Sequence, residues 1–299
     1  MTILQCLYIC KIAEYGSFNE AAKQLFVAQS SLSVSVKSLE QELNIKIFER
    51  VGNGVQLTND GVEFLGYARQ IVEQSDFITN RYSKNEFGQK LYISAQHYDF
   101  VADIFTKLLN ETTDNRYRFS LREMKTYDVI SEVETSYCDI GIIVIKDTDF
   151  SVMERYLNQR NITFTSVFKV RPHVYVRNGH PLAKLDKISN ENLISYPFVS
   201  YEQGEHNHLF FTEELSNIHS EKQVEISDRA SLMNCLIGTD SYTIGTGIMP
   251  SLLNEGRIVS IPFKSDDLYT IGYILRTDKK PSALTEKFIN MLKSNSKTF

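Results

Sequence analysis

Residues 16–43, GSFNEAAKQLFVAQSSLSVSVKSLEQEL, predict two helices that are joined by a short turn. Ser17 and Glu20 form a Ser-x-x-Glu capping pattern, which starts a helix that we expect to run through about Leu25. After a turn at residues 26–28, a second helix is expected from about Gln29 to Leu43.

The second helix is amphipathic. Its apolar residues are spaced four, three and four positions apart and predict one buried stripe, which consists of Leu32, Val36, Leu39 and Leu43. The side chains off this stripe are expected to face outward: Gln29, Ser30, Ser31, Ser33, Val34 and Lys37. Two helices joined by a tight turn, the second polar on its open face, are typical of a helix-turn-helix.

The flanking residues complete a DNA-binding module. A first helix begins at Ile3, where Leu4, Leu7, Tyr8 and Ile12 recur at helical spacing, and ends at Gly16. Residues 47–57 predict two short strands around a Gly-Asn-Gly tip, which together form a wing.

A long helix is expected from about Thr58, its N-cap, to Tyr82. Its apolar seam has loose heptad character and comprises Val62, Leu65, Ile71, Val72, Phe77 and Ile78. We interpret it as a dimerisation helix; the alternative is a helix that packs within a single chain.

Beyond a polar linker at residues 83–89, strands alternate with helices, which favours parallel sheets. We expect strands at 90–95, 117–124, 139–145, 170–176, 198–201, 224–226, 242–245 and 268–276, and helices at 100–109, 127–137 and 284–293. The expected fold is therefore α+β and multidomain, with a winged helix-turn-helix at 1–58, a linker and dimerisation helix with hinge at 59–89, and a domain of two α/β lobes with a cleft between them at 90–299. The first lobe should comprise about 90–161 and 266–299, and the second about 162–265.

Length and composition agree with this organisation. The 299 residues suit two or three domains, and 42% hydrophobic with 23% charged residues is ordinary for a globular protein. The net charge of −5 argues against general polyanion binding, but site-specific DNA binding needs only a local basic face. With no apolar run long enough for a membrane span and no signal peptide pattern, we expect a cytoplasmic protein that does not contact a membrane.

Many of these residues together resemble the LysR-type transcriptional regulators. The resemblance rests on Gly16-Ser17-Phe18, Ala21-Ala22, Leu25, Gln29, Leu32-Ser33, Leu39-Glu40, Leu43, Phe48-Glu49-Arg50, Leu57-Thr58 and Gly61, with weaker matches at Cys138-Asp139-Ile140-Gly141 and at residues 245–250. It implies an effector-binding domain similar to periplasmic binding proteins, with a small-molecule inducer between its lobes. It also implies a homodimer or homotetramer on an interrupted palindromic operator in double-stranded DNA, with RNA polymerase as a further partner.

The chain departs from the family pattern at several positions. Ala28 stands where a hydroxyl residue usually caps the third helix, Ser30 replaces a common proline, and Val34 replaces an arginine found in several members. Asn44 and Ile47 stand where glycine and leucine are usual. Residues 1–60 hold five basic and six acidic side chains, so DNA binding should depend on fit more than on bulk attraction.

The candidate DNA contacts follow from this module: Ser17, Gln29, Ser30, Ser31, Ser33, Val34, Lys37, Arg50 and Asn53. A glutamine at the start of the recognition helix can bond adenine, and a valine can touch a thymine methyl group. Lys37 and Arg50 are predicted phosphate contacts. A solvated helix surface remains open for the polar residues, local packing for Val34, an ion pair with Glu49 or Glu40 for Arg50, and turn chemistry for Asn53.

Candidate effector contacts lie after strand ends, where α/β folds bind ligands: Ser94, Gln96, His97, Thr126, Ser200, Tyr201 and Thr246. Thr126 can also cap the helix that follows it, and ordinary capping or hydrogen bonding is the alternative role for all seven.

Enzyme chemistry is not expected. The chain has no GxSxG, P-loop or complete dinucleotide fingerprint, and neither a cofactor nor a metal is predicted; a loop metal site at His206 and His208 is the weaker alternative. Cys6, Cys10, Cys138 and Cys235 form no CxxC spacing and are read as reduced, buried thiols. Two other functions stay open: a redox-responsive regulator acting through Cys138 or Cys235, and a solute-binding module without a role on DNA.

Overall fold

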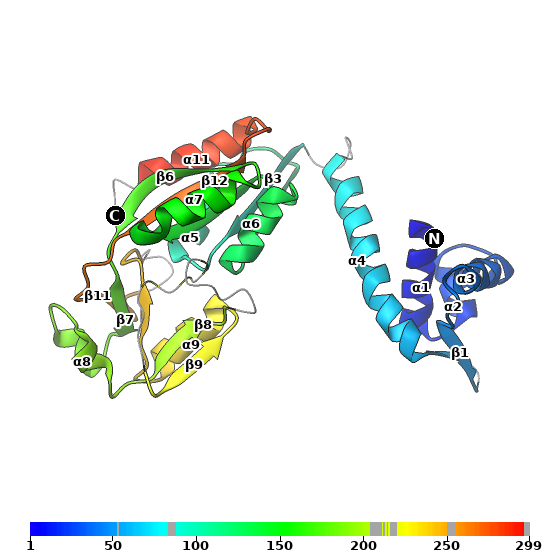
Figure 1. The fold of residues 1–299 in the computed structure, drawn as a ribbon, viewed down its shortest axis with the longest axis horizontal. Helices are drawn as coiled ribbons and strands as arrows, with labels where there is room; N and C mark the ends of the chain where they lie inside the picture. Colours follow the sequence, from blue (N-terminus) through cyan, green and yellow to red (C-terminus); the bar gives the residue numbers. More distant parts are fainter. Residues whose placement is uncertain are drawn as a thin grey trace. The chain divides into compact units, whose positions relative to one another are not determined.

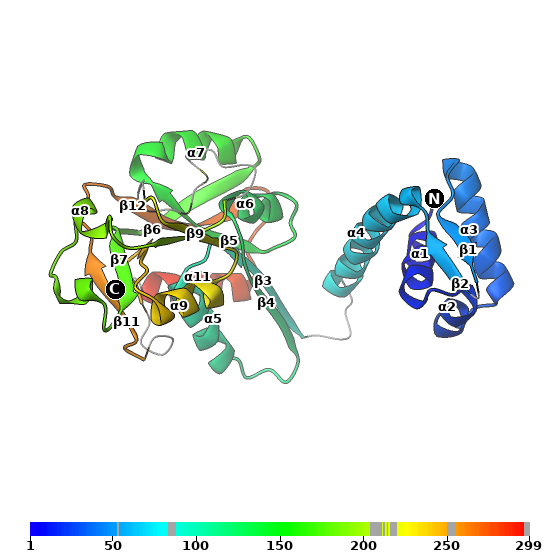
Figure 2. The ribbon, with the colours of Figure 1, turned by 90° about the horizontal axis from the view of Figure 1, so that it is seen from below.

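The structure is a computed structural model that describes residues 1–52, 54–82, 88–203, 211, 213, 215, 220–249 and 255–295. The chain divides into two compact units, residues 1–86 and 87–299, and each is described by itself (Figures 1 and 2). None of the helices in the described ranges is both long enough and apolar enough to cross a membrane.

The first unit has the predicted order of elements. It consists of α1 (Ile3–Tyr15), α2 (Phe18–Gln24), α3 (Gln29–Leu43), β1 (Phe48–Val51), β2 (Gly54–Leu57) and α4 (Asn59–Tyr82). The Ser17 hydroxyl accepts a hydrogen bond from the Glu20 amide and caps α2, as its position predicts. The antiparallel pair β1–β2 is the wing.

Most of the predicted stripe of α3 lies in the core of this unit. Leu32, Val36 and Leu39 are buried against α1 and α2. Leu43 is 36% exposed, so its prediction was wrong; the helix ends there because Asn44 adopts a left-handed conformation (φ 53°). Leu4 is 54% exposed, although it recurs at helical spacing with Leu7 and Tyr8, because the buried face of α1 is formed by Cys6, Tyr8, Ile9 and Ile12.

Polar contacts hold α3, the wing and α4 together. One carboxylate oxygen of Glu40 in α3 accepts hydrogen bonds from the Ile47 and Phe48 amides at 2.8 and 3.2 Å. The Thr58 hydroxyl accepts from the Gly61 amide at 3.0 Å and thereby caps α4, as predicted. A side-chain carbon at Gly61 would lie 2.1 Å from the Ile47 carbonyl oxygen, so α4 approaches the wing at this glycine.

The second unit contains a five-stranded sheet with the strand order β4-β3-β5-β12-β6. We name this sheet and the helices that pack on it the first lobe. Its strands are β3 (Gln89–Ala95), β4 (Tyr117–Glu123), β5 (Ile140–Lys146), β6 (Ile162–Val170) and β12 (Tyr269–Arg276), and its helices are α5 (Asp99–Asn110), α6 (Thr126–Glu134), η1 (Asp147–Asp149), α7 (Phe150–Asn158) and α11 (Ala283–Asn295). Strand β3 pairs in parallel with β4 and β5, whereas β12 is antiparallel to β5 and β6. The sheet is therefore mixed and not purely parallel.

The second lobe comprises two small sheets, β10-β7-β11 and β8-β9. Its strands are β7 (His173–Arg177), β8 (Phe198–Tyr201), β9 (Gln223–Ile226), β10 (Thr243–Gly245) and β11 (Ile258–Pro262), and its helices are η2 (Pro181–Lys184), α8 (Asn190–Leu193) and α9 (Arg229–Gly238). In Figure 1 these elements lie below the five-stranded sheet, within the same unit.

The chain crosses between the lobes later than the sequence indicates. The expected single strand at 170–176 is divided, because β6 ends at Val170 and β7 begins at His173, with Pro172 between them. Strand β6 pairs with β12 of the first lobe from Ile162 to Val170, except at Val167 where the register shifts, whereas the sequence predicted that residues from 162 onward belong to the second lobe. Proline has no amide hydrogen to continue a strand ladder, which accounts for the break.

Candidate functional sites

The outward face of α3 is open. Gln29, Ser30, Ser31 and Ser33 are exposed, as is Lys37, and the Val34 side chain is 69% exposed. Ala28 is the N-cap of α3 and supplies no side-chain hydrogen bond, so the first amides of the helix have no such partner. The helix therefore presents polar side chains and amide donors together at its N-terminus.

A groove runs between α3 and the wing, and we name it the α3–wing groove. Of the predicted DNA contacts it brings together Gln29, Ser33, Lys37 and Arg50, and Lys46 also lines it. Ser30, Ser31 and Val34 are exposed but lie outside the groove lining. Ser17 is used as the cap of α2, and Asn53 lies outside the described residues.

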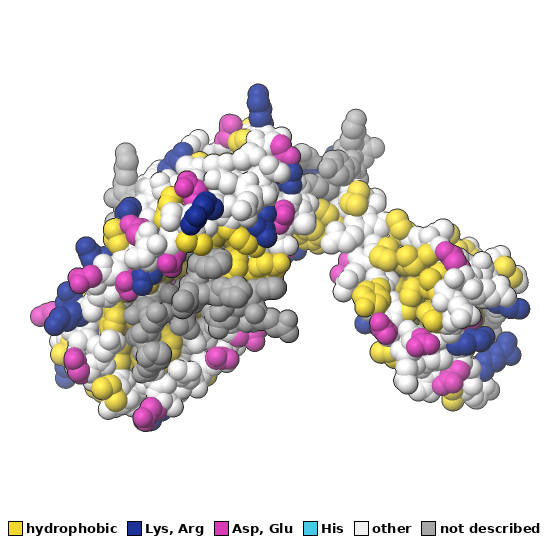
Figure 3. Space-filling view, in the orientation of Figure 1, with side chains coloured by type: hydrophobic (Ala, Val, Ile, Leu, Met, Phe, Trp, Pro, Cys, Tyr) yellow, Lys and Arg dark blue, Asp and Glu magenta, His cyan; other side chains and the backbone are white. Residues whose placement is uncertain are grey.

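The cations at the groove differ in their partners. Lys46 lies 3.7 Å from the Glu40 carboxylate, which is otherwise held by the wing amides. Among the ion pairs of the described residues, none joins Arg50 to Glu40 or Glu49, the pairing that the sequence left open. Figure 3 shows the Lys and Arg side chains of this unit gathered along one edge, beside acidic ones.

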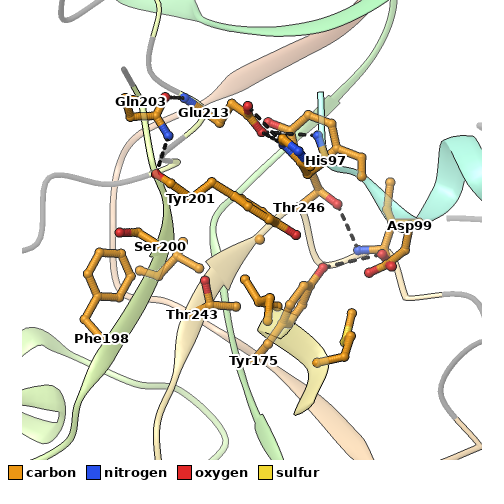
Figure 4. A pocket seen from close by; sticks show the side chains of 16 residues that line it. His97, Asp99, Tyr175, Phe198, Ser200, Tyr201, Gln203, Glu213, Thr243 and Thr246 are labelled. Carbon is orange, nitrogen blue, oxygen red and sulfur yellow. Dashed lines mark hydrogen bonds and ion pairs between the residues drawn. The ribbon is translucent and has the colours of Figure 1, made fainter. Parts of the chain in front are cut away.

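A cavity of about 50 Å³ lies between the two lobes of the second unit, and we name it the interlobe cavity (Figure 4). The first lobe contributes His97, Tyr98 and Asp99, which lie between the end of β3 and the start of α5. The second lobe contributes Tyr175 from β7, Ser200 and Tyr201 from β8, and Thr243, Gly245 and Thr246 at the end of β10. A side-chain carbon at Gly245 would lie 2.2 Å from the Tyr175 ring, so this glycine makes room for that ring.

His97 connects the two lobes across the cavity. Its ring stacks on Tyr201 with 4.2 Å between centroids, and its Nδ1 lies 3.0 Å from a carboxylate oxygen of Glu213. The His97 amide donates to the same carboxylate at 3.1 Å. Glu213 is in turn fixed by Gln203, whose side-chain oxygen accepts from the Glu213 amide.

A second connection is a cluster of Asp99, Glu123 and Arg229, which we name the arginine cluster. Arg229, the first residue of α9, donates to Asp99 at 2.8 Å and lies 3.1 Å from Glu123 at the end of β4. Burial raises the pKa of the Asp99 carboxyl above its usual range, although the Arg229 guanidinium acts against this. Burial raises the pKa of Glu123 in the same way. Two partly desolvated carboxylates therefore share one guanidinium.

The structure separates the predicted effector contacts into two groups. His97, Ser200, Tyr201 and Thr246 line the interlobe cavity. Ser94, Gln96 and Thr126 are not among the described residues that line it, and each is fully buried.

The buried group is used inside the first lobe. The Gln96 side chain donates to Thr126 and accepts from the Val144 amide at 2.7 Å, and Ser94 donates to Glu132. Thr126 is the first residue of α6 and not its cap, which is Lys125. These contacts join β3, β5 and α6.

Sequence reasoning missed several residues of the cavity. Tyr98 and Asp99 follow the predicted site residue His97 directly, so their position after a strand end could have identified them. Glu213 carried no such signal, since it does not follow a predicted strand. Arg229, which contacts Asp99 beside the cavity, was missed because the helix α9 and its Asp228 cap were not recognised. Tyr175 points into the cavity from the centre of a strand.

The cysteines carry no disulfide, since all four are free. Burial raises the pKa of the Cys138 thiol to about 12, so almost none is thiolate at neutral pH, and thiolate is the form that attacks peroxide. This disfavours a redox role for Cys138. In the part of the chain that the structure describes, no three His, Cys, Asp or Glu side chains gather as a metal site; His206 and His208 lie outside that part.

Two protein families match this chain. A family described as "Bacterial regulatory helix-turn-helix protein, lysR family" matches residues 3–62, and one described as "LysR substrate binding domain" matches residues 111–297. The first range contains the helix-turn-helix and wing, and the second contains most of the two-lobed unit.

Individual proteins agree with these families. The chain is 23% identical over 287 residues to the uncharacterised HTH-type transcriptional regulator YbhD of Escherichia coli K12, covering 94% of this chain and 87% of that protein. It is 25% identical to the HTH-type transcriptional regulator SoxR of an Arthrobacter species, covering 96% and 95%. The crystal structure of CbnR, a LysR family transcriptional regulator, has the same fold with a TM-score of 0.61 at 15% identity, covering 98% of this chain and 99% of that one. A structure of CbnR with its target DNA gives 0.62 at 16% identity, with the same coverage.

Proposed function

Because this chain belongs to the LysR family of DNA-binding transcriptional regulators with an effector-binding domain, we propose that Gln29, Ser33 and Lys37 of α3 contact operator DNA and that a small molecule in the interlobe cavity controls this contact. The observation that carries the proposal is the α3–wing groove, where three predicted contacts on α3 lie beside Arg50 of the wing. A recognition helix inserted in the major groove places its first residues at base edges.

The groove residues divide by chemistry. The Gln29 amide can bond adenine N6 and N7, and the Ser33 hydroxyl can reach a base or a phosphate. Lys37 has a compact ammonium charge and Arg50 has a planar guanidinium with several donors, and both groups are suited to binding phosphate. Ser30, Ser31 and Val34 are exposed on the same helix and remain proposed contacts beside the groove.

Substitution of Gln29 tests base reading. In Gln29→Ala, the difference in binding free energy between the preferred base pair and the others at one operator position should fall by about 1–3 kcal/mol. In Lys37→Ala, the affinity for all DNA sequences should fall alike, and it should depend less on salt concentration. The measurement is binding to a panel of operators with single base changes, selected from genomic DNA. Gln41→Ala, an exposed glutamine at the far end of the same helix, is the matched control. An unchanged preference in Gln29→Ala would remove this residue from base reading.

We further propose that the chain assembles as a dimer through α4, and as a dimer of dimers on an interrupted palindrome. Six residues of α4 line one apolar hollow with Ile3 of α1, and their spacing places them on one face of the helix: Tyr67, Gln70, Ile71, Gln74, Ser75 and Ile78. Tyr67 and Ile78 are more than half exposed, which is unusual for large apolar side chains on one face.

Oligomeric state tests this surface. Ile78→Glu should convert the assembly to smaller species in light scattering, because a carboxylate in an apolar interface has no partner. Thr79→Glu is the control, since Thr79 is exposed on α4 but belongs neither to the predicted seam nor to the lining of the hollow. A dimer that persists unchanged in Ile78→Glu would contradict the proposed interface.

The effector is proposed to act by changing how the lobes meet. His97 and Arg229 already join residues of both lobes, so a ligand among them alters the closure of the lobes and thereby the pairing of subunits on DNA. Contact with RNA polymerase would follow from binding beside a promoter, and the cytoplasm is where such a regulator acts.

A further inference from the structure

The interlobe cavity is acidic and aromatic, and this limits which ligands it can hold. Its described lining includes the carboxylates of Asp99 and Glu213 and contains no lysine or arginine. A third carboxylate, Glu123, lies behind it in the arginine cluster. The nearby cations are Arg229 and, when protonated, His97.

Both cations are already bound to carboxylates. Arg229 contacts Asp99 at 2.8 Å and Glu123 at 3.1 Å, and the Nδ1 atom of His97 contacts Glu213 at 3.0 Å. An anionic ligand would therefore meet the two carboxylates that line the cavity, Asp99 and Glu213, and would have to displace a carboxylate to reach a positive charge. The negative charge of such a ligand and the carboxylates around it would repel each other strongly, because little water screens them in the cavity.

A second, independent observation points to a ligand. Tyr98 lines the cavity, is only 7% exposed, and its hydroxyl has no hydrogen-bond partner among the residues that the structure describes. A buried hydroxyl without a partner costs free energy, which a ligand that bonds to it would recover. The negative charge of Glu213 acts on this hydroxyl and contributes to raising the pKa of Tyr98, after burial itself.

The aromatic rings favour the same ligand charge. Tyr175 and Tyr201 extend from the second lobe toward His97 and Asp99 of the first (Figure 4). The faces of such rings attract cations, and the attraction is strongest where water is excluded. The cavity of about 50 Å³ has room for a ligand of only a few heavy atoms.

We propose that the effector of this protein is a small alkylammonium ion, held in the interlobe cavity by Asp99, Glu213 and the Tyr98 hydroxyl. This rests on the proposed effector control and gives it a ligand class. The ammonium group donates to the carboxylates and to the Tyr98 oxygen, and its alkyl part lies against Tyr175 and Tyr201. Asp99, Glu123 and Glu213 together carry more negative charge than the Arg229 guanidinium neutralises, and the positive charge of the ligand balances this excess.

Three probes of similar size separate the ligand classes: ethylammonium chloride, acetamide and sodium acetate, at one ionic strength set with sodium chloride. Calorimetric titration of the full-length protein should show binding of ethylammonium and much weaker binding of the neutral and anionic probes. Potassium chloride in the same titration distinguishes an alkylammonium site from a general cation site. Acetate binding as tightly as ethylammonium, or potassium replacing it fully, would overturn the proposal.

Two variants test the residues. Tyr98→Phe removes only the hydroxyl and should weaken ethylammonium binding by about threefold to tenfold. Asp99→Asn should weaken it more, while Asp114→Asn, an exposed position outside the cavity lining, should leave the affinity unchanged. Full affinity in both Tyr98→Phe and Asp99→Asn would refute the assignment, and Tyr98→Phe keeps the test valid if the charge variant does not fold.

Operator binding separates this proposal from the broader one. If ethylammonium fails to bind and acetate alters the mobility of protein–DNA complexes, the effector control stands and the ligand class is wrong. If ethylammonium binds with the expected dependence on Asp99 but never alters DNA binding, the ligand class stands and the proposed control is wrong.

Discussion

At the scale of single residues, Ala28 is the position where the recognition helix departs most from local rules. It occupies the N-cap of α3 and offers no acceptor to the amides that follow. Serine, threonine, aspartate or asparagine at this position normally supplies that acceptor. The first turn of α3 is therefore held by its packing on the core and not by its own cap.

Ala28→Ser should stabilise the first turn of α3 by about 0.5–2 kcal/mol, because the new hydroxyl can accept from the amides of that turn. Hydrogen exchange at residues 29–31 of the full-length protein should slow in proportion. Ala28→Val, which offers no acceptor, is the control and should not slow exchange. Unchanged exchange in Ala28→Ser would mean that this turn is already capped by another group.

The sequence could predict some residues of the interlobe cavity and not others, and the difference lies in single side chains. Four residues that were chosen for their position after a strand end line one cavity: His97, Ser200, Tyr201 and Thr246. The same rule does not reveal that Gln96 turns inward to Thr126 and Val144, because that choice depends on a neighbour thirty or more residues away. The sequence therefore locates the strand ends that border the cavity better than it selects the individual residues that line it.

At the scale of elements, the junction of the wing and α4 depends on close approach of two backbones. A side-chain carbon at Gly61 would lie 2.1 Å from the Ile47 carbonyl oxygen, whereas one at Gly66 in the same helix meets nothing within 4 Å. Both glycines lie in the same helix and therefore have the same backbone conformation. Only their surroundings differ.

Gly61→Ala should destabilise the first unit by about 1–3 kcal/mol, because backbone must move to admit the methyl group. Gly66→Ala should instead stabilise it by about 0.5–1 kcal/mol, since alanine loses less conformational entropy in a helix. Chemical unfolding followed by circular dichroism measures both. A stabilising Gly61→Ala would show that α4 does not lie against Ile47 in solution.

Elements with a strong local period were predictable, and those defined by long-range pairing were not. The α2–α3 pair and the wing follow from caps, a helical stripe and a glycine-rich tip. Strand β6 (ITFTSVFKV) pairs with β12, which lies far away in the sequence, and it follows α7, a helix that the sequence analysis also missed. The mixed direction of the first sheet likewise arises because β12 returns from the second lobe and enters antiparallel.

At the scale of the whole effector-binding unit, the arginine cluster joins the two lobes and makes their contact depend on pH. The ordinary pKa values of Asp99 and Glu123 are 3.8 and 4.5, and burial raises both in the folded protein. Between the unfolded and folded pKa values, the folded state holds more protons than the unfolded state. The contribution of these two carboxyls to stability therefore falls as pH rises through that window and is constant on either side of it.

Asp99→Asn removes one of these titrating groups, so the stability of the variant relative to the wild type should rise as pH increases through the raised pKa of Asp99. Calorimetric unfolding without ligand, from pH 4 upward, measures this difference, with Asp114→Asn as the exposed control. Arg229 opposes the effect of burial on both carboxyls, so Arg229→Leu should move the window to higher pH. A variant whose stability relative to wild type falls with pH would mean that the guanidinium outweighs burial, and that the cavity has less unbalanced negative charge than an ammonium ligand requires.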